Sequence, residues 1–258
     1  MNKKLFAFDV DGTLLNSQKE LLDSTVRAIK QLKTNGHVVT VATGRSLFLI
    51  EDILEALELE TYIICNGAIA FHEHQQIYKN ALDRQRLLEL ADFLDEKSID
   101  LALTGLDGIC RTSSNDLPKM KEVLTVLGGV LPAQDQAYVE ENEIYQGLGF
   151  YNEQFDSTFE EHFPDFRFVR WHKECVDVIS SEGSKATTLL YLAEQLNIAQ
   201  QDIIAFGDGN NDLEMLALAG VGVAMGNASE KVKSSANLVT DTNDDNGIYK
   251  ALKRLGML

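Results

Sequence analysis

Two aspartates, Asp9 and Asp11, follow a short apolar run near the start of the chain and precede Gly12 and Thr13. The run, Leu5–Phe8, has the composition of a buried strand, so the sequence predicts a strand that ends in a pair of carboxylates. Carboxylates placed in this way can act as a nucleophile and as a general acid or base, or can bind a hard cation. This pair is the most informative chemical feature of the chain.

Polar residues also follow two other predicted strands. Thr43 comes directly after a strand predicted at 38–42, and Asp208 comes shortly after one predicted at 203–206. In open α/β sheets, ligands bind outside the carboxyl ends of the strands. We therefore expect these residues to meet Asp9 at one edge of a sheet.

The residue types match the requirements of phosphoryl transfer. That reaction needs a nucleophile in line with phosphorus, an acid or base for the leaving and attacking oxygens, and positive charge on the non-bridging oxygens. Asp9 and Asp11 are candidates for the first two roles. Thr43 and Gly44 lie at a predicted strand-to-helix turn, where a hydroxyl and backbone N–H groups can hold phosphate oxygens. Lys185 would add a positive charge.

The acidic residues also predict a metal ion. A phosphate beside Asp9 and Asp11 would crowd negative charges, which is costly unless a cation is present, and Asp208 supplies a further carboxylate. Carboxylates, water and a phosphate suit Mg²⁺ better than zinc or copper. Asn211, in the same acidic segment, offers an amide donor to the phosphate, whereas Arg45 is left out of the site because it can pair with surface acids.

The elements that position these residues alternate between apolar, β-branched runs and helical patterns, which is typical of βαβ units on a parallel sheet. One helix is expected to be capped by Asp23 or Ser24 and to end at Asn35 and Gly36. The other predicted elements are strands at 5–8, 38–42, 62–65, 203–206 and 221–224, a hairpin at 68–79, and helices at 47–57, 185–196 and 213–218.

The middle of the chain lacks the regular alternation of strands and helices, and its pattern predicts an inserted α+β domain. It contains predicted helices at 87–97 and 118–127 and short predicted strands at 101–104, 109–111, 144–150, 166–170 and 175–179. The expected fold is therefore α/β, with a Rossmann-like, doubly wound parallel sheet as the core and an inserted α+β cap domain. The expected domains are residues 1–82 and 180–258 for the core and 83–179 for the cap.

Taken together, the polar segments resemble the motifs of the haloacid dehalogenase (HAD) superfamily in their order and approximate spacing. Asp9 to Thr13 resembles its first motif, Asp-x-Asp-Gly-Thr, and the later matches are Thr43-Gly44, Lys185 and Gly207 to Asp212. The position of the insert, together with 66–68 and 176–185, is similar to the Cof-type class IIB sugar-phosphatase-like branch.

This resemblance implies roles for individual residues. Asp9 would attack phosphorus and form an aspartyl-phosphate, and Asp11 would protonate the leaving oxygen and later activate water. The metal would be held by Asp9, the backbone carbonyl of Asp11 and Asp208, with Asp212 supporting them from outside. Because dehalogenases of the superfamily usually lack the second aspartate, Asp11 favours phosphate chemistry.

The resemblance also completes the phosphate site. Backbone atoms at Val10 and Asp11 would join the candidate phosphate-binding residues, which are Val10, Thr43, Gly44, Lys185 and Asn211. The implied function is a Mg²⁺-dependent phosphatase acting on small phosphomonoesters such as sugar phosphates, flavin mononucleotide or pyridoxal phosphate.

Two other functions remain open. A phosphomutase of the phosphomannomutase type would need a bisphosphate activator and release little free phosphate. A non-catalytic phosphoacceptor, similar to response-regulator receivers, is disfavoured by the chain length and the large insert. In the predicted cap, the cluster 170–173 (Arg-Trp-His-Lys) could read the leaving group, but packing or solvent exposure is the favoured interpretation.

Composition limits the partners. The chain has 258 residues with 45% hydrophobic content and a formal net charge of −17, which disfavours nucleic acid. A small phosphorylated metabolite, the partner that the resemblance implies, is compatible with this charge, because local cations and backbone donors in a pocket can overcome a repulsive long-range field. No secretion signal or membrane-length apolar run is present, so no membrane association is expected. The odd number of scattered cysteines indicates a reducing cytoplasm, and a monomer is the default expectation.

Overall fold

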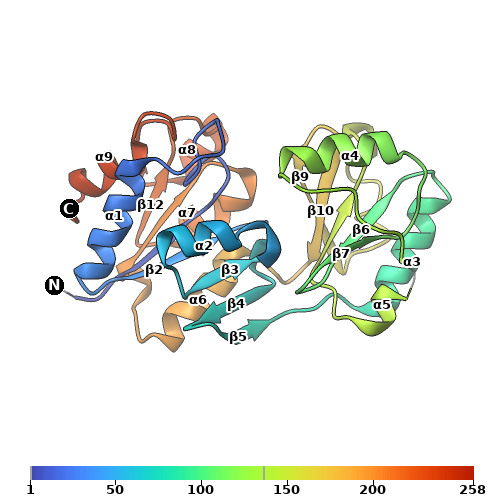
Figure 1. Cartoon of the computed structure of the whole chain (residues 1–258), viewed down its shortest axis with the longest axis horizontal. Coiled ribbons are helices and arrows are strands. Elements are labelled where there is room, and N and C mark those ends of the chain that lie inside the picture. Colours follow the sequence, from blue (N-terminus) through green and yellow to red (C-terminus); the bar gives the residue numbers. More distant parts are fainter. Residues whose placement is uncertain (1, 136) are drawn as a thin grey trace. The chain divides into compact units, whose positions relative to one another are not determined.

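The computed structural model describes residues 2–135 and 137–258 and divides the chain into two compact units (Figure 1). The first, here called the core unit, comprises the chain up to Gly44, Asp52–Tyr78 and Ser184–Leu258. The second, here called the insert unit, comprises Arg45–Glu51 and Lys79–Gly183.

The core unit is built around an eight-stranded sheet. Its strands are β1 (Leu5–Phe8), β2 (Val38–Ala42), β3 (Tyr62–Ile64), β4 (Ile69–His72), β5 (Gln75–Lys79), β11 (Ile203–Gly207), β12 (Val221–Ala224) and β13 (Leu238–Val239). Their order is β13-β12-β11-β1-β2-β3-β4-β5. The pairs from β13 to β3 are parallel, whereas β4 pairs with β3 antiparallel. The predicted α/β class with a Rossmann-like core is confirmed.

The register of the central strands decides where the polar residues meet. Phe8 pairs with Phe206 of β11 and with Val41 of β2, so all three strands end at nearly the same level. The rings of Phe8 and Phe206 stack at 4.7 Å between centroids, and every residue of β1 is buried. Asp9 therefore leaves the sheet beside the residues that follow β11 and β2.

Helices cover this sheet. Alanine and leucine side chains of α6 and α7 pack with Leu5 and Ala7 of β1, and α1 contacts both α9 and β2. The six α-helices of the core unit are α1 (Asp23–Thr34), α2 (Glu51–Leu57), α6 (Lys185–Gln195), α7 (Leu213–Leu218), α8 (Glu230–Ser235) and α9 (Gly247–Arg254).

The insert unit has a five-stranded antiparallel sheet with helices on both faces. The strands are β6 (Leu101–Thr104), β7 (Ile109–Arg111), β8 (Gln146–Gly149), β9 (Phe166–His172) and β10 (Cys175–Ser180), in the order β7-β6-β8-β10-β9. The helices are α3 (Arg84–Asp95), α4 (Leu117–Val126) and α5 (Tyr138–Glu141). Because side chains alternate along a strand, Leu101 and Leu103 pack on α3, whereas Ala102 packs on α4.

Two local predictions are wrong. The helix predicted at 47–57 is divided into a 3₁₀ turn, Leu47–Leu49, and α2. Leu22, not Asp23 or Ser24, occupies the N-cap position of α1 and makes no side-chain cap. The Ser24 hydroxyl instead bonds the Asn246 side chain at 2.6 Å, so a tertiary contact replaces the expected local one.

Besides short 3₁₀ turns, the sequence predictions omitted three α-helices and one strand of the described residues: α5, α8, α9 and β13. A signal was present for α9, because Ile248, Ala251 and Leu252 follow the helical i, i+3, i+4 spacing and are all buried. Across the described parts of the chain, no helix has the length and apolar character needed to cross a membrane.

Candidate functional site

A buried lysine lies at the centre of the candidate site in the core unit. Lys185 Nζ donates to Asp9 Oδ1 at 2.6 Å and to Asp212 Oδ1 at 2.8 Å. The side chains of Lys185 and Asp212 are 1% and 0% exposed, and that of Asp9 is 8% exposed. The ion pairs join residues from the end of β1, the start of α6 and the turn after β11, so they form only when the core unit folds.

A glycine lets α6 bring Lys185 into this position. Gly67 has a positive φ of 96°, and a Cβ there would lie 2.3 Å from the Ser184 carbonyl oxygen and 2.9 Å from the Lys185 backbone nitrogen. The Gly67 carbonyl accepts the Thr188 hydroxyl at 2.5 Å, and Ser184 caps the helix by accepting from the Thr187 N–H. Only a residue without a side chain permits this approach of the loop to the helix start.

Asp212 shapes the turn that carries Asp208. Its Oδ2 accepts the backbone N–H groups of Asp208 at 3.0 Å and Gly209 at 2.9 Å, while Oδ1 accepts Lys185. Both oxygens of Asp212 are therefore used by the protein. A Cβ at Gly207 would lie 2.6 Å from this carboxylate, so the turn also needs glycine there.

Asp208 is held on both carboxylate oxygens. Oδ1 accepts the Thr13 hydroxyl at 3.1 Å, and Oδ2 accepts the side-chain amide of Asn227, also at 3.1 Å. Gly12 lies directly against it with φ 75°, and a Cβ there would be 2.2 Å from Oδ2. Gly12 and Thr13, from the first motif, therefore contact Asp208, from the last motif.

The electrostatics of the cluster favour a cation. Oxygens of Asp9, Asp208 and Asp212 all lie within 4.8 Å of one another. Burial, and next the charge of Asp212, raise the pKa of Asp9 well above its usual value, although Lys185 opposes the shift. Burial and Asp212 raise the pKa of Asp208 to about 6. Burial alone would lower the pKa of Lys185, but the two carboxylates outweigh it and raise that pKa.

These residues fit a hard divalent cation. Three carboxylates face a single ammonium group, so a negative excess remains in a largely buried space. All the donors are carboxylate oxygens, without cysteine or histidine, which is the ligand chemistry of Mg²⁺ rather than of zinc or copper. Because Asp212 already accepts three hydrogen bonds, Asp9 and Asp208 are the better candidates for direct ligands.

Asp11 has a partner that the sequence analysis missed. Lys19 Nζ lies 2.6 Å from Asp11 Oδ1, and the two side chains are 46% and 32% exposed. Asp11 also forms an isolated parallel bridge with Leu15, so the chain makes a tight loop directly after β1. Asp11 lies near the buried cluster, since its charge acts on Asp208, and its carboxylate is partly open to solvent.

The remaining candidates for phosphate binding lie on neighbouring turns. Val10 and Thr43 are buried at the ends of β1 and β2. Asn66 links Asn211 to Thr43. Its Oδ1 accepts the Asn211 side-chain amide at 3.0 Å, and its backbone N–H donates to the Thr43 carbonyl at 2.9 Å. A Cβ at Gly44 would be 3.1 Å from the Asn66 amide. Asn66 entered the sequence analysis only as part of a branch motif, without a role at the site.

In the insert unit, the structure favours the packing interpretation of the cluster 170–173. The Arg170 guanidinium binds the Asp156 carboxylate and the Tyr151 carbonyl and lies over the Tyr151 ring at 5.2 Å. Trp171 packs against the apolar cluster under α4. His172 Nδ1 accepts the backbone N–H of Glu174. Arg170 is therefore committed to holding the insert unit together.

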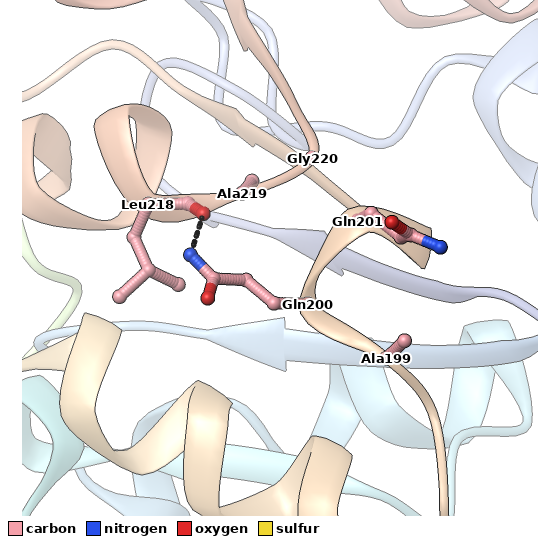
Figure 2. A pocket seen from close by; sticks show the side chains of 6 residues that line it. All are labelled: Ala199, Gln200, Gln201, Leu218, Ala219 and Gly220. Atoms are coloured by element: carbon pink, nitrogen blue, oxygen red, sulfur yellow. Dashed lines mark hydrogen bonds between the residues drawn. The ribbon is translucent and has the colours of Figure 1, made fainter.

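A surface pocket of about 460 Å³ lies at the amino ends of the core strands, whereas the carboxylate cluster lies at their carboxyl ends (Figure 2). It is bordered by 199–201, before β11, and by 218–220, before β12. Gln200 Nε2 donates to the Leu218 carbonyl at 2.8 Å there. Its lining has no ionisable side chain, so it offers none of the chemistry of the carboxylate cluster.

Comparison with known proteins identifies the family of the chain. The sequence profile of the haloacid dehalogenase-like hydrolases matches residues 6–252. YkrA of Bacillus subtilis (strain 168) is 38% identical over 258 residues, which is 100% of both proteins. The 5-amino-6-(5-phospho-D-ribitylamino)uracil phosphatase YitU of the same strain is 30% identical over 261 residues, or 96% of each. The solved structure of the HAD subclass IIB sugar phosphatase BT4131 matches with a TM-score of 0.89 at 28% identity, over 99% of this chain and 100% of that one.

We expect Lys185→Met to lower the free energy of unfolding by about 3–5 kcal/mol at pH 7, because it leaves buried carboxylates without their cation. Lys4→Met is the matched control, since Lys4 Nζ makes an equally short ion pair with Asp202, at 2.5 Å, on a more exposed surface. Its cost should be about 1 kcal/mol or less. Urea unfolding measures both, and equal losses would contradict a stabilising role specific to Lys185.

Asp208 should make the metal-free protein less stable as pH rises. Its folded pKa of about 6 exceeds the ordinary 3.8, so the folded state binds the proton more tightly and loses this advantage between about pH 4 and pH 6. Between pH 5 and pH 7, the free energy of unfolding of Asp208→Asn should therefore rise by about 1 kcal/mol relative to that of wild type, after allowance for solvent screening. Urea unfolding in chelator at both pH values tests this.

The matched control for that measurement is Asp52→Asn, which changes an exposed carboxylate on α2. It shows how much the removal of one exposed negative charge by itself changes the free energy of unfolding at each pH. If Asp208→Asn differs from wild type no more between the two pH values than this control does, the electrostatic account of the cluster is contradicted.

Proposed function

The chain belongs to the haloacid dehalogenase-like hydrolase family, in its Cof-type class IIB branch, and we propose that its carboxylate cluster is the active site of a Mg²⁺-dependent phosphatase that works through an aspartyl-phosphate. Family membership and phosphatase relatives make the chain a phosphoric monoester hydrolase. The observation that carries the proposal is the buried Asp9 carboxylate, held at 2.6 Å by Lys185.

Asp9 is the proposed nucleophile. Attack on phosphorus requires the ionised form, yet burial and neighbouring carboxylates favour the protonated form. Lys185 counteracts this and fixes the side chain with a charge-assisted hydrogen bond. As a bond forms between an Asp9 oxygen and phosphorus, the bond from phosphorus to the ester oxygen breaks.

Asp11 is the proposed acid and base. In the first step its carboxyl proton passes to the departing ester oxygen, which leaves as an alcohol. In the second step the Asp11 carboxylate takes a proton from water, whose oxygen attacks phosphorus and returns Asp9 to a free carboxylate with release of inorganic phosphate. The position of Asp11 near the buried cluster and partly open to solvent supports this role.

The phosphate would be held by Val10, Thr43, Gly44, Lys185 and Asn211, and the Asn66 side chain would hold Asn211 in place. Mg²⁺ would be held by Asp9, Asp208 and the Asp11 carbonyl and would supply positive charge to the phosphate oxygens. Asp212 would support this set through the N–H groups of Asp208 and Gly209.

We propose a small phosphorylated metabolite as the substrate. The named activities of BT4131, a sugar phosphatase, and YitU, which acts on a phosphoribityl compound, support this class. Sugar phosphates, flavin mononucleotide and pyridoxal phosphate are the first compounds to test. The insert unit, residues 83–179 in particular, is the proposed cap that would select among them.

The test is phosphate release from this panel with Mg²⁺ and with chelator, for wild type and Asp9→Asn. Release should require metal and fall by roughly 10³-fold or more in Asp9→Asn, because the amide is a poor nucleophile of nearly the same size. Circular dichroism should show an intact fold. Persistent activity in the pure variant would contradict the covalent route, and absence of release by wild type would favour a mutase or a phosphoacceptor.

Asp11→Asn should slow both formation and hydrolysis of the aspartyl-phosphate, each by roughly 10²–10⁴-fold, because one group serves both proton transfers. Rapid-quench measurement of the burst and of the steady-state rate separates the two steps. Unchanged rates for both would remove Asp11 from the acid–base role.

A further inference from the structure

Asn227, in the turn after β12, contacts two parts of the candidate active site. Its amide Nδ2 donates to the Gly12 carbonyl at 2.9 Å and to Asp208 Oδ2 at 3.1 Å. The acceptors come from the first and last motifs of the chain, 215 and 19 residues away in sequence. One amide group thus joins the loop after β1 to the turn after β11.

The orientation of this amide is determined by its surroundings. The backbone N–H of Asn243 donates to Asn227 Oδ1 at 3.1 Å, so the oxygen must face Asn243. A carbonyl and a carboxylate can only accept, so the nitrogen must face Gly12 and Asp208. Reversing the amide would break all three hydrogen bonds.

Asn243 belongs to the loop 240–246, which is tied to the segment 12–17 after β1. The Asn243 amide donates to the Leu15 carbonyl at 2.8 Å, and Asp244 Oδ1 accepts the Ser17 N–H at 2.8 Å. Together with the hydrogen bond from Asn227 to Gly12, these contacts give the segment 12–17 three hydrogen bonds to the end of the chain.

The same loop is also fixed to the turn that carries Asn227. The Gly226 N–H donates to the Asp241 carbonyl at 3.0 Å. A Cβ at Gly226 would lie 2.8 Å from the Thr242 nitrogen, so the two backbones are in direct contact. The position of Asn227 is therefore determined by the loop 240–246 as well as by its own strand.

We propose that Asn227 is a positioning residue for the Asp208 carboxylate, oriented by the loop 240–246, and that it raises the affinity of the site for Mg²⁺. This inference rests on the proposed metal site. Thr13 holds one oxygen of Asp208 and Asn227 holds the other, so rotation of the carboxylate about its Cβ–Cγ bond is restrained. A ligand held in this way loses less conformational freedom when the cation binds.

The choice of asparagine follows from its neighbours. Aspartate at 227 would still accept from Asn243 but would face Asp208 with a second negative charge and no donor. Alanine would leave both the Gly12 carbonyl and one Asp208 oxygen without their partner. Asparagine supplies one acceptor and one donor group without adding charge.

The experiment is calorimetric titration of the metal-free full-length protein with Mg²⁺, for wild type, Asn227→Ala and Asn237→Ala. Loss of a hydrogen bond to a metal ligand typically weakens binding about 10-fold or more, which is the result expected for Asn227→Ala. Asn237 is the matched control, because its Oδ1 accepts the Gly222 N–H at 2.7 Å at the other end of β12, away from Asp208. Its Mg²⁺ affinity should stay within about twofold of wild type.

Wild-type affinity in Asn227→Ala, even with a lowered melting temperature, would overturn the inference and leave Asn227 a purely structural residue. Absence of Mg²⁺ binding by wild type would overturn the proposed metal site itself, and this inference with it. If Asn227→Ala does not fold, Asn227→Asp decides, since it keeps the acceptor for the Asn243 N–H but has no donor for Gly12 or Asp208. Mg²⁺ affinity weakened by roughly threefold or more, despite the added negative charge, supports the inference, and unchanged or tighter affinity overturns it.

Discussion

The ammonium group of Lys185, buried between Asp9 and Asp212, is the interaction on which the candidate site depends. Two carboxylates cannot remain ionised in so little solvent without a cation, because burial and mutual repulsion both favour the protonated forms. Lys185 opposes this effect at Asp9 and ties the start of α6 to the ends of β1 and β11. Positioning of the proposed nucleophile and stability of the core unit therefore rest on the same contacts, which makes the lysine difficult to replace.

The backbone around this ion pair is shaped to let polar groups approach one another. Gly12 lies against Asp208, Gly207 against Asp212, and Gly67 against the start of α6, each at a distance that a Cβ would block. Asp212 accepts three hydrogen bonds within the protein, whereas each oxygen of Asp208 accepts only one, which leaves lone pairs for a metal. The three carboxylates thus differ in role although they lie within 4.8 Å of one another.

The insert unit differs from the core unit in its sheet and in the use of its charged residues. Its antiparallel sheet has helices on both faces, and its most conspicuous cation, Arg170, is bound to Asp156 and stacked on Tyr151. A guanidinium held in this way stabilises the unit rather than awaiting a ligand. The proposed division of work keeps the chemistry in the core unit and assigns selection of the leaving group to other residues of the insert unit.

The sequence by itself determined the fold class and the approximate limits of the main elements, because apolar periodicity and glycine turns are local properties. It also placed the candidate residues, since Asp9, Thr43 and Asp208 each follow a strand of a parallel sheet. Other features were decided only by the tertiary structure. Phe8 pairs with Phe206, and this register sets Asp208 beside Gly12; Lys185 reaches Asp9 across 176 residues of chain. Asn227 lies in no recognised motif, and its contacts depend on the packing of a distant loop, which no local pattern encodes.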